Sequence, residues 1–433
     1  METQLKLLIK NARQVVQVCS KGEKILVGPA MRKLAILNET NEEGISIVVN
    51  RQGSISAIDT HSKIMKNFSH CSFDHVIDAT GKCILPGLID GHTHPVWAGD
   101  RVHEFAMKLA GASYEEIHQA GGGIHFTTEK TRAASEDELL ASFKDRLMSM
   151  LRYGTTTVEC KSGYGLDTDS EIKMLRVIER ARKEVPIEIS STFCGAHAVP
   201  KGSSVKQATE DVLNNQLPAV LLLNQTGELQ VENIDVFCEK GVFDCDQTKQ
   251  ILEAGVKGGL AINFHAEELN YLGSAEIGAD LNARAMSHLE KISDAGITAM
   301  AKSGSVAVML PNTAYILRLV PPPVRKMIEA GVPIALGTDF NPNAFCLSMV
   351  VTMHFACVIL RMSMEESLVA ATINAAASIG RAETHGSLEV SKFADMIVAD
   401  VTRWEHLIYQ LGSSDQLIQH VIKKGEIVHS RPS

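Results

Sequence analysis

The chain has 433 residues, which is enough for one large domain and a smaller second one. Hydrophobic residues make up 45% of the chain and charged residues 21%, as in ordinary globular proteins. The formal net charge of −9 argues against non-specific binding of nucleic acid, because such binding needs clustered lysine and arginine.

Neither a membrane span nor a secretory leader is expected. No apolar stretch of the sequence reaches spanning length, and the opening segment is too short and too interrupted for a signal peptide. The nine cysteines are scattered without a Cys-x-x-Cys pair, a pattern typical of reduced thiols. These features predict a cytoplasmic protein with no membrane partner.

The two ends of the chain have the pattern of β-structure. Short strands are predicted at residues 5–9, 15–19, 45–49 and 55–59. So small a sheet is a poor core by itself. Residues 395–400 form another apolar strand and residues 421–428 a tight hairpin. We therefore predict that residues 1–83 and 385–433 pair into one composite β-sandwich domain.

The middle of the chain, residues 84–384, alternates apolar strands with amphipathic helices. Strands are predicted at residues 84–89, 155–159, 187–193, 234–237, 261–264, 285–287, 305–310 and 334–336. Capping boxes predict helix starts at Ser135 with Glu138, Thr168 with Glu171, and Ser363 with Glu366. Eight such strands favour a (β/α)₈ TIM-like barrel of the α/β class. A doubly wound sheet is the alternative, but it would have a glycine-rich fingerprint after its first strand.

The first of these strands runs into Asp90-Gly91-His92-Thr93-His94 instead. Strand alternation sends His92 and His94 to the same side, where both reach one borderline cation such as zinc or iron. For an isolated pair, ordinary hydrogen-bonded histidines would be the better interpretation. Further residues of the types that bind metals or take part in catalysis follow the later strands, and they favour a metal site instead. They are Glu159, Lys161, His197, Glu239, Lys240, His265, Glu268, His288 and Asp339.

Two of these residues complete a ligand set. His265 ends a buried strand and is the third predicted ligand, and Asp339 follows the last strand as the fourth, with a turn or cap as its alternative role. Three histidines and one aspartate leave a coordination position open for water, which marks a catalytic site. A bound cation acidifies that water and polarises a carbonyl. The sequence thus indicates hydrolytic attack on an amide, amidine or related carbon.

Several neighbouring residues keep more than one interpretation. Glu268 is either a base or substrate contact, or a carboxylate favoured at a helix N-terminus, whereas Glu267 is the structural member of the pair. His288 is a second metal ligand, a proton relay or a core histidine. Lys161 or Lys240 could be carbamylated to bridge two ions, but nothing in the sequence requires it. We expect one divalent or trivalent ion per chain.

The motif PGLIDGHTH at residues 86–94, His265 and the GTD motif at 337–339 resemble the metal-dependent amidohydrolase superfamily. Within it, four segments resemble the imidazolonepropionase family, which opens the imidazolone ring in L-histidine degradation. They are HPVWAGDR at 94–101, ECKSGYGL at 159–166, GAHAVP at 195–200 and DFNP at 339–342. The resemblance extends over nearly the whole chain.

The resemblance implies roles for individual residues. Metal ligation falls to His92, His94, His265 and Asp339, and substrate contacts to Arg101, Tyr164, His197, Glu268 and Asn341. The implied substrate, 4-imidazolone-5-propanoate, has a propionate tail that the Arg101 guanidinium would hold bidentately. Tyr164 and His197 would hydrogen-bond the ring nitrogens or the carbonyl oxygen. Without the resemblance, a surface arginine, a packed aromatic and a core histidine would be the better interpretations.

The implied reaction gives N-formimidoyl-L-glutamate, with the proton moved by Glu268, His288 or Asp339. The metal, zinc or iron, stays open, and a homodimer is the default assembly. Two alternatives are a deaminase of guanine or cytosine type and a non-catalytic assembly protein on this scaffold. The sequence departs from many bacterial members, which have glutamine where Glu268 stands and Gly-Thr or Gly-Ser where Asn343-Ala344 stand. The role of that loop is therefore open.

Overall fold

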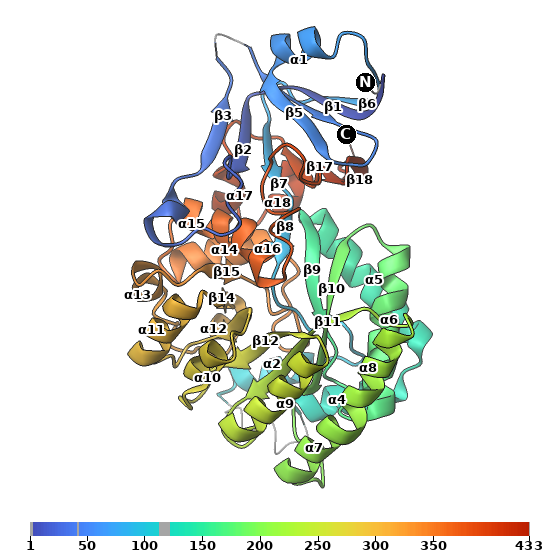
Figure 1. Cartoon of the computed structure of the whole chain (residues 1–433), viewed down its shortest axis with the longest axis vertical. Helices are drawn as coiled ribbons and strands as arrows, with labels where there is room; N and C mark the ends of the chain where they lie inside the picture. The colour runs from blue at the N-terminus through green and yellow to red at the C-terminus, as the bar shows by residue number, and fades with distance from the viewer. Residues whose placement is uncertain (1–2, 41–42, 112–121, 433) are drawn as a thin grey trace.

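Figure 1 shows the computed structural model, which describes residues 3–40, 43–111 and 122–432. Two sheets made from both ends of the chain lie at one end of the molecule, and an eight-stranded barrel surrounded by helices lies at the other (Figure 1). No helix among these residues is both long enough and apolar enough to cross a lipid bilayer.

Of the two terminal sheets, one contains only N-terminal strands, and the other interleaves strands from the two chain ends. The four-stranded sheet contains, in spatial order, β5 (Ile55–Thr60), β4 (Ile45–Val49), β1 (Gln4–Ala12) and β6 (Ser72–Asp78). The six-stranded sheet contains β18 (Glu426–Ser430), β17 (Ile418–Lys423), β16 (Met396–Ala399), β7 (Cys83–Pro86), β2 (Gln14–Val18) and β3 (Ala35–Asn38). One buried cluster, which includes Ile9, Ile47, Ile84 and Met396, joins residues of both sheets. The predicted pairing of the two chain ends is confirmed.

The barrel consists of eight strands in sequential order, and every neighbouring pair is parallel. They are β8 (Leu88–Asp90), β9 (Thr155–Lys161), β10 (Glu188–Ala196), β11 (Val231–Cys238), β12 (Ala261–Ala266), β13 (Ala285–His288), β14 (Val306–Met309) and β15 (Ile334–Leu336). A bridge between Thr93 and Phe340 brings the first and last strands together. The (β/α)₈ prediction is therefore confirmed, and the doubly wound alternative is excluded.

Helices connect and cover the barrel strands, as Figure 1 shows. In chain order they are α2 (Val102–Leu109), α4 (Ile124–Ala133), α5 (Glu136–Arg152), α6 (Thr168–Glu184), α7 (Val205–Asp211), η2 (Val212–Gln216), α8 (Leu217–Gln225), α9 (Cys245–Lys257), α10 (Ser274–Asp280), α11 (Asp294–Ser303), α12 (Pro311–Ile316), α13 (Val324–Glu329), α14 (Met349–Val358), α15 (Met364–Ala370) and α16 (Ile373–Ser378). Shorter helices accompany the terminal sheets, namely η1 (Gly28–Arg32), α1 (His61–Asn67), α17 (His406–Tyr409) and α18 (Ser414–Leu417).

The run 84–89, predicted as one strand, is two strands in two different sheets. β7 pairs with β16 and β2 in the terminal sheet, whereas β8 pairs with β9 in the barrel. Gly87 separates them, and a Cβ at this position would lie 2.2 Å from the Thr156 hydroxyl. Continuous apolar character hides such a break, because both strands are buried on both faces.

Two of the three predicted capping boxes are confirmed, at Ser135 and at Ser363. The third is wrong, because Asp167 caps α6 and accepts from the Ser170 amide. Glu171 is fully buried and turns instead to the preceding loop, where it accepts backbone N–H groups of Gly163, Gly165 and Leu166 at 2.7–3.0 Å. A buried carboxylate needs several donors, and this loop supplies more of them than a helix N-terminus does.

A charged cluster joins the amino end of the barrel to the terminal sheets. The carboxylate of Glu188, the first residue of β10, lies 3.2 Å from His385 Nε2, 3.3 Å from Lys423 Nζ and 3.2 Å from Lys424 Nζ. Burial opposes ionisation, but the hydrogen bond from His385 and the lysine charges hold the pKa of Glu188 well below its usual range. Glu188 is therefore an anion that ties the two parts of the fold together.

Replacing Glu188 should cost stability in a pH-dependent manner. A depressed pKa stabilises the fold above the unfolded-state pKa of about 4.5 and loses that contribution as the pH falls through the folded-state value. We expect Glu188→Gln to lower the free energy of unfolding at pH 7 by about 2 kcal/mol, because it removes one of the two carboxylates that His385 and Lys423 contact, and Asp395 remains. Urea unfolding at pH 7, pH 4 and pH 3 measures this, with most of the change expected below pH 4.

The exposed Lys144–Glu184 pair provides the control for this experiment. Glu184→Gln should change stability by less than about 1 kcal/mol, because water screens such a pair. A difference between wild type and Glu188→Gln that does not shrink at pH 3 would contradict the expectation.

Candidate active site

One cavity lies at the carboxyl ends of the barrel strands. Barrel enzymes place their catalytic groups at this end. Its walls contain all the predicted site residues except His92, which lies deeper. The lining residues are His94, Arg101, Ile124, Tyr164, His197, Phe237, His265, Glu268, Leu269, His288, Thr313, Leu317, Asp339, Asn341 and Asn343.

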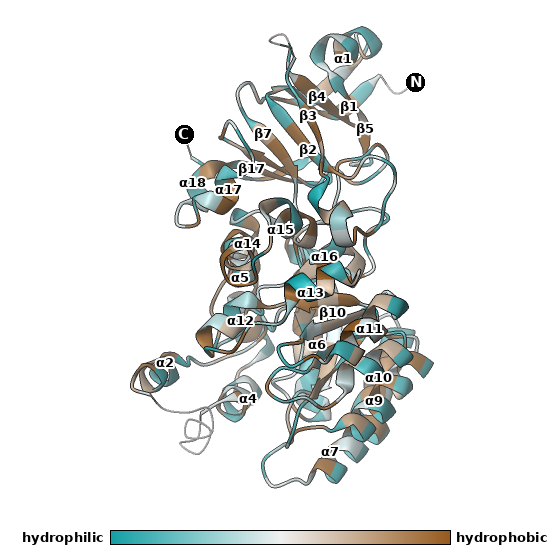
Figure 2. Ribbon diagram, turned by 90° about the vertical axis from the view of Figure 1, so that its left-hand side faces the viewer, coloured by the Kyte–Doolittle hydropathy of each residue, from teal (hydrophilic) through white to brown (hydrophobic). Residues whose placement is uncertain are grey.

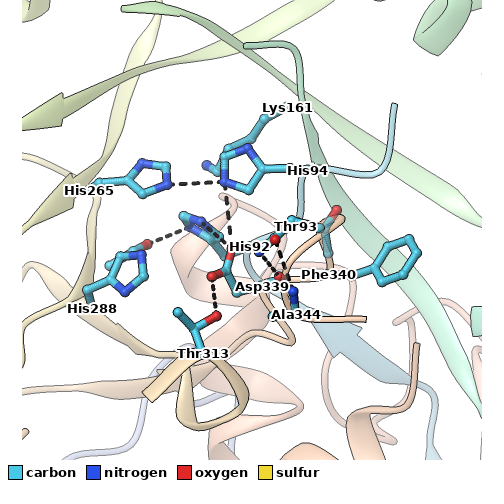
Figure 3. Close-up of polar contacts among 12 residues, drawn as sticks. His92, Thr93, His94, Lys161, His265, His288, Thr313, Asp339, Phe340 and Ala344 are labelled. Atoms are coloured by element: carbon cyan, nitrogen blue, oxygen red, sulfur yellow. Dashed lines mark hydrogen bonds and ion pairs between the residues drawn. The ribbon is translucent and has the colours of Figure 1, made fainter. Parts of the chain in front are cut away.

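The four predicted metal ligands converge at the base of this cavity (Figure 3). His94 Nε2 lies 3.1 Å from His265 Nε2. Asp339 Oδ1 lies 3.5 Å from His92 Nε2 and 3.7 Å from His94 Nε2. Atoms about 2.0–2.2 Å from one five-coordinate ion, with four protein ligands and an open position, lie roughly 3.0–3.6 Å apart. Nε2 of His92 is buried with no hydrogen-bond partner among the described residues. These side chains therefore fit one metal ion.

An outer layer of side chains orients these ligands. Nδ1 of His265 lies 2.8 Å from the Asp235 carboxylate, and Nδ1 of His92 lies 2.8 Å from the Ser287 hydroxyl. The hydroxyl of Thr313 donates to the second oxygen of Asp339 (Figure 3). A hydrogen bond at Nδ1 leaves Nε2 facing the centre of the cluster, as a metal-ligating imidazole requires.

Lys161 lies beneath this layer and is fully buried. Its ammonium group lies 2.7 Å from Asp235 and 2.6 Å from Glu159. Burial disfavours the charge, but the two carboxylates raise the pKa of Lys161 above its usual range. A protonated amine between two carboxylates is not nucleophilic, which argues against a carbamylated Lys161. Lys240 is exposed and does not line the cavity.

Three titratable side chains, His288, Glu268 and Glu290, lie close together, and the first two line the cavity. His288 Nε2 lies 3.6 Å from Glu268, and His288 Nδ1 lies 3.7 Å from Glu290. Burial opposes a charged imidazole, but the two carboxylates raise the pKa of His288 to about 10. Burial raises the pKa of Glu268 to about 7, against the effect of His288. The wall thus pairs a cationic imidazole with a carboxylate that gains and loses a proton near neutral pH.

Glu267 is structural, as predicted, because its carboxylate accepts the amide and hydroxyl of Ser274. The backbone around it is unusual. Glu267, His288, Leu289 and Asp339 all have positive φ angles, between 49° and 77°. Non-glycine residues adopt such angles at a cost, and these four lie where barrel strands deliver the candidate site residues, whereas others, such as Asn11 and Val18, lie elsewhere.

The predicted substrate-contacting residues line the same cavity. The ring of His197 stacks on that of His94 with centroids 4.6 Å apart, and its Nδ1 lies 2.9 Å from the carbonyl oxygen of Gly163. Burial lowers the pKa of His197 to about 3, so the imidazole is neutral. The Tyr164 ring lies 5.3 Å from that of His197. Asn341 uses its amide locally, because its Oδ1 accepts the backbone N–H of Asn343.

Comparison with known proteins decides the family. Residues 83–428 match the model of the amidohydrolase family. A protein named probable imidazolonepropionase from Nematostella vectensis is 63% identical over 98% of this chain and 99% of its own length. The protein of that name from Homo sapiens is 58% identical over 98% of both chains. The chain belongs to the imidazolonepropionase family. It is thus a hydrolase of the metal-dependent amidohydrolase superfamily.

Solved structures of other amidohydrolases share the fold. Guanine deaminase from C. acetobutylicum superposes with a TM-score of 0.71 at 16% identity, covering 98% of this chain and 99% of that one. A triazine hydrolase variant superposes with a TM-score of 0.72 at 17% identity, covering 99% and 96%. At such identities the likeness concerns architecture alone, whereas family membership rests on the sequence relatives.

Sequence reasoning missed the residues that orient the ligands in this imidazolonepropionase-family site. Asp235 lies within β11, a mostly buried strand that also contains Glu232 and Asn233, and a charged residue in its apolar second half was the available signal. Ser287 and Thr313 carried no signal, because buried hydroxyl groups are common in barrel strands and helix starts. Glu239, noted as a strand-end acid, accepts backbone N–H groups of Leu269 and Asn270 and supports a loop.

Asp235→Asn should weaken metal binding. The amide keeps the shape of the side chain but removes the charge that His265 and Lys161 both contact. Loss of such a partner typically lowers metal affinity by about 10–100-fold. Competition against a chelator, followed by elemental analysis, measures the affinity.

Asp246→Asn, an exposed change at the start of α9, is the control and should retain the wild-type affinity. Circular dichroism separates metal loss from unfolding. Equal metal retention by Asp235→Asn and wild type would show that the carboxylate does not support the ligand.

Proposed function

We propose that this chain hydrolyses 4-imidazolone-5-propanoate to N-formimidoyl-L-glutamate in L-histidine degradation, with one zinc or iron ion per chain. The observation that carries the proposal is 63% identity, over nearly the full length, to a protein named probable imidazolonepropionase. The cavity supports it, because candidate metal ligands and a buried arginine line the same space.

His92, His94 and His265 would hold the ion through Nε2, and Asp339 through a carboxylate oxygen. Imidazole and carboxylate ligands suit zinc and iron alike. When bound, the ion acidifies a water molecule and polarises the substrate carbonyl. The fixed Nδ1 hydrogen bonds of His92 and His265 keep both rings ready to bind.

Arg101 would bind the propionate group of the substrate, because a guanidinium matches a carboxylate with paired hydrogen bonds. Tyr164 and His197 would face the imidazolone ring from the opposite wall. With Nδ1 held by the Gly163 carbonyl, the neutral His197 has Nε2 left to contact a polar ring atom. Asn341 would contribute mainly by shaping the loop that holds Asn343 at the cavity wall.

Glu268 would act as the general base. A carboxyl group with a pKa of about 7 is matched to proton transfer at neutral pH, so Glu268 would take a proton from the attacking water and pass it to the leaving ring nitrogen. The cationic His288 would stabilise the negative charge that develops on the carbonyl oxygen. Asp339 would remain a ligand, since Thr313 already donates to its second oxygen.

The domain division, assembly and location that the sequence predicts are part of the proposal. Residues 1–83 with 385–433 would form one domain and residues 84–384 the other; the shared terminal sheet supports the division, but through β7 it extends to Pro86. We propose a homodimer, which is common among soluble enzymes. The scattered cysteines are consistent with a reducing, cytoplasmic location.

Substrate turnover tests the proposed function directly. The purified holoenzyme should consume 4-imidazolone-5-propanoate and contain about one metal ion per chain. His265→Ala should lose most of both, because it removes one ligand from the cluster. Elemental analysis and product chromatography provide the measurements.

The same assay separates the rival activities. Ammonia release from guanine or cytosine, without turnover of the imidazolone, would assign the chain to the deaminases. If protein prepared without chelators contains no metal and shows no turnover, the chain is a non-catalytic scaffold protein.

Glu268→Gln tests the base. In the wild type, kcat/KM should fall as the pH is lowered through about 7, because protonation removes the base. The variant should lose about 10²–10⁴-fold in kcat and should lack this acid limb. Glu253→Gln on α9, away from the cavity, should keep the wild-type pH profile. A similar acid limb in Glu268→Gln would assign the titration to another group.

A further inference from the structure

Helix α2 has an inverted distribution of charge. Its outward residues Val102, Phe105 and Leu109 are apolar, with 69%, 48% and 63% of their surface exposed. Figure 2 places the helix at the end of the molecule away from the terminal sheets. A surface helix normally turns its apolar stripe inward and its charges outward.

The inward face of α2 carries the charges. Arg101, Glu104 and Lys108 are spaced i, i+3 and i+7, so they share one side of the helix. Arg101 is 8% exposed and Glu104 only 1%. Burying charged groups is unfavourable unless they are paired, and their burial beside the cavity indicates a role other than solubility.

Glu104 holds the Arg101 guanidinium in a defined position. Its Oε2 accepts Nε of Arg101 at 2.9 Å and Nη2 at 2.6 Å. Its Oε1 accepts the backbone N–H of Gly123 at 2.8 Å, which fixes the carboxylate from the other side. Arg101 lines the cavity, whereas Glu104 does not. Glu104 would therefore act on a ligand only through Arg101.

Lys108 supplies the positive charge that this pair lacks. The charges of Arg101 and Glu104 largely cancel at a distance, so the pair alone attracts an anion weakly. The ammonium of Lys108 donates to the side-chain oxygen of Asn343, which lines the cavity. Burial and the nearby Arg101 lower the pKa of Lys108 to about 8. A bound anion in the cavity would favour its charged form.

We propose that the inward face of α2 is the specificity element for an anionic substrate tail. In it, Glu104 positions the Arg101 guanidinium, and Lys108 adds a second positive charge while it holds Asn343 against the cavity. This inference rests on the proposed function, in which the tail is a propionate. It assigns roles to Glu104 and Lys108, and it gives Asn343 a partner on α2.

Binding of a ligand that cannot be hydrolysed tests the specificity element separately from catalysis. Holoenzyme is titrated calorimetrically with imidazole-4-propanoate and with its neutral amide, which has nearly the same shape. The wild type should bind the acid at least about 10-fold more tightly, as charge-assisted hydrogen bonds allow. Glu104→Ala and Lys108→Met should each reduce this preference at least about 5-fold and leave amide binding within about 2-fold.

Lys302→Met, an exposed change on α11, is the matched control and should keep the preference. In an Arg101→Ala background, Glu104→Ala should cause no further loss, because Glu104 acts through Arg101. A further loss there would overturn the positioning role. The proposal would be overturned if the wild type bound the acid and the amide with nearly equal affinity. It would also be overturned if Glu104→Ala and Lys108→Met lost acid and amide binding equally.

The two proposals can fail separately. Wild-type enzyme that prefers the acid but does not hydrolyse 4-imidazolone-5-propanoate would refute the proposed function and retain the specificity element. If the enzyme hydrolyses this substrate and both variants keep the wild-type preference for the acid over the amide, the proposed function is retained and the specificity element is refuted.

Discussion

The Asp235 carboxylate is the contact on which the candidate metal centre depends. It faces the imidazole of His265 on one side and the ammonium of Lys161 on the other, in a part of the barrel that water does not reach. A histidine ring without such a partner would be free to rotate and to change tautomer. The lysine also matters, because a lone carboxylate buried at this depth would be protonated and would bind the ring less strongly.

Charged side chains cluster at both ends of the barrel, and the two clusters have different roles. At the amino ends, Glu188 gathers cations from the terminal sheet and from the segment before it, and this joins the two parts of the fold. At the carboxyl ends, His288 and Glu268 lie 3.6 Å apart beside the candidate metal ligands. This separation follows the general division in TIM barrels, where one end carries stability and the other carries chemistry.

The walls of the cavity above the candidate metal centre are formed by loops and a helix that follow the barrel strands, and not by the strands themselves. The buried carboxylate of Glu171 holds the loop of Tyr164, Asn341 holds the loop of Asn343, and α2 brings Arg101 to the opposite wall. Each of these is a short segment fixed by hydrogen bonds to backbone or side chains. The metal ligands can therefore keep one geometry while the surrounding walls determine which substrate enters.

The sequence by itself determined the barrel and the pairing of the chain ends, and it named the candidate metal ligands that the structure brings together. Strand and helix periodicities are local, and His92, His94, His265 and Asp339 each occupy a strand end that is visible in the linear order. Only the tertiary structure decided the partners of these residues. Ser287 lies 195 positions from His92, and no local pattern connects them.

The same holds for the interpretations that the sequence left open. Whether Lys161 is carbamylated or an ammonium, and whether Glu267 or Glu268 faces the cavity, depends on which charges neighbouring strands bring within hydrogen-bonding distance. The break at Gly87 was hidden for a related reason, because two strands buried in different sheets have the same apolar composition. Local periodicity specifies secondary structure, whereas the state of a buried charge is fixed by its neighbours in space.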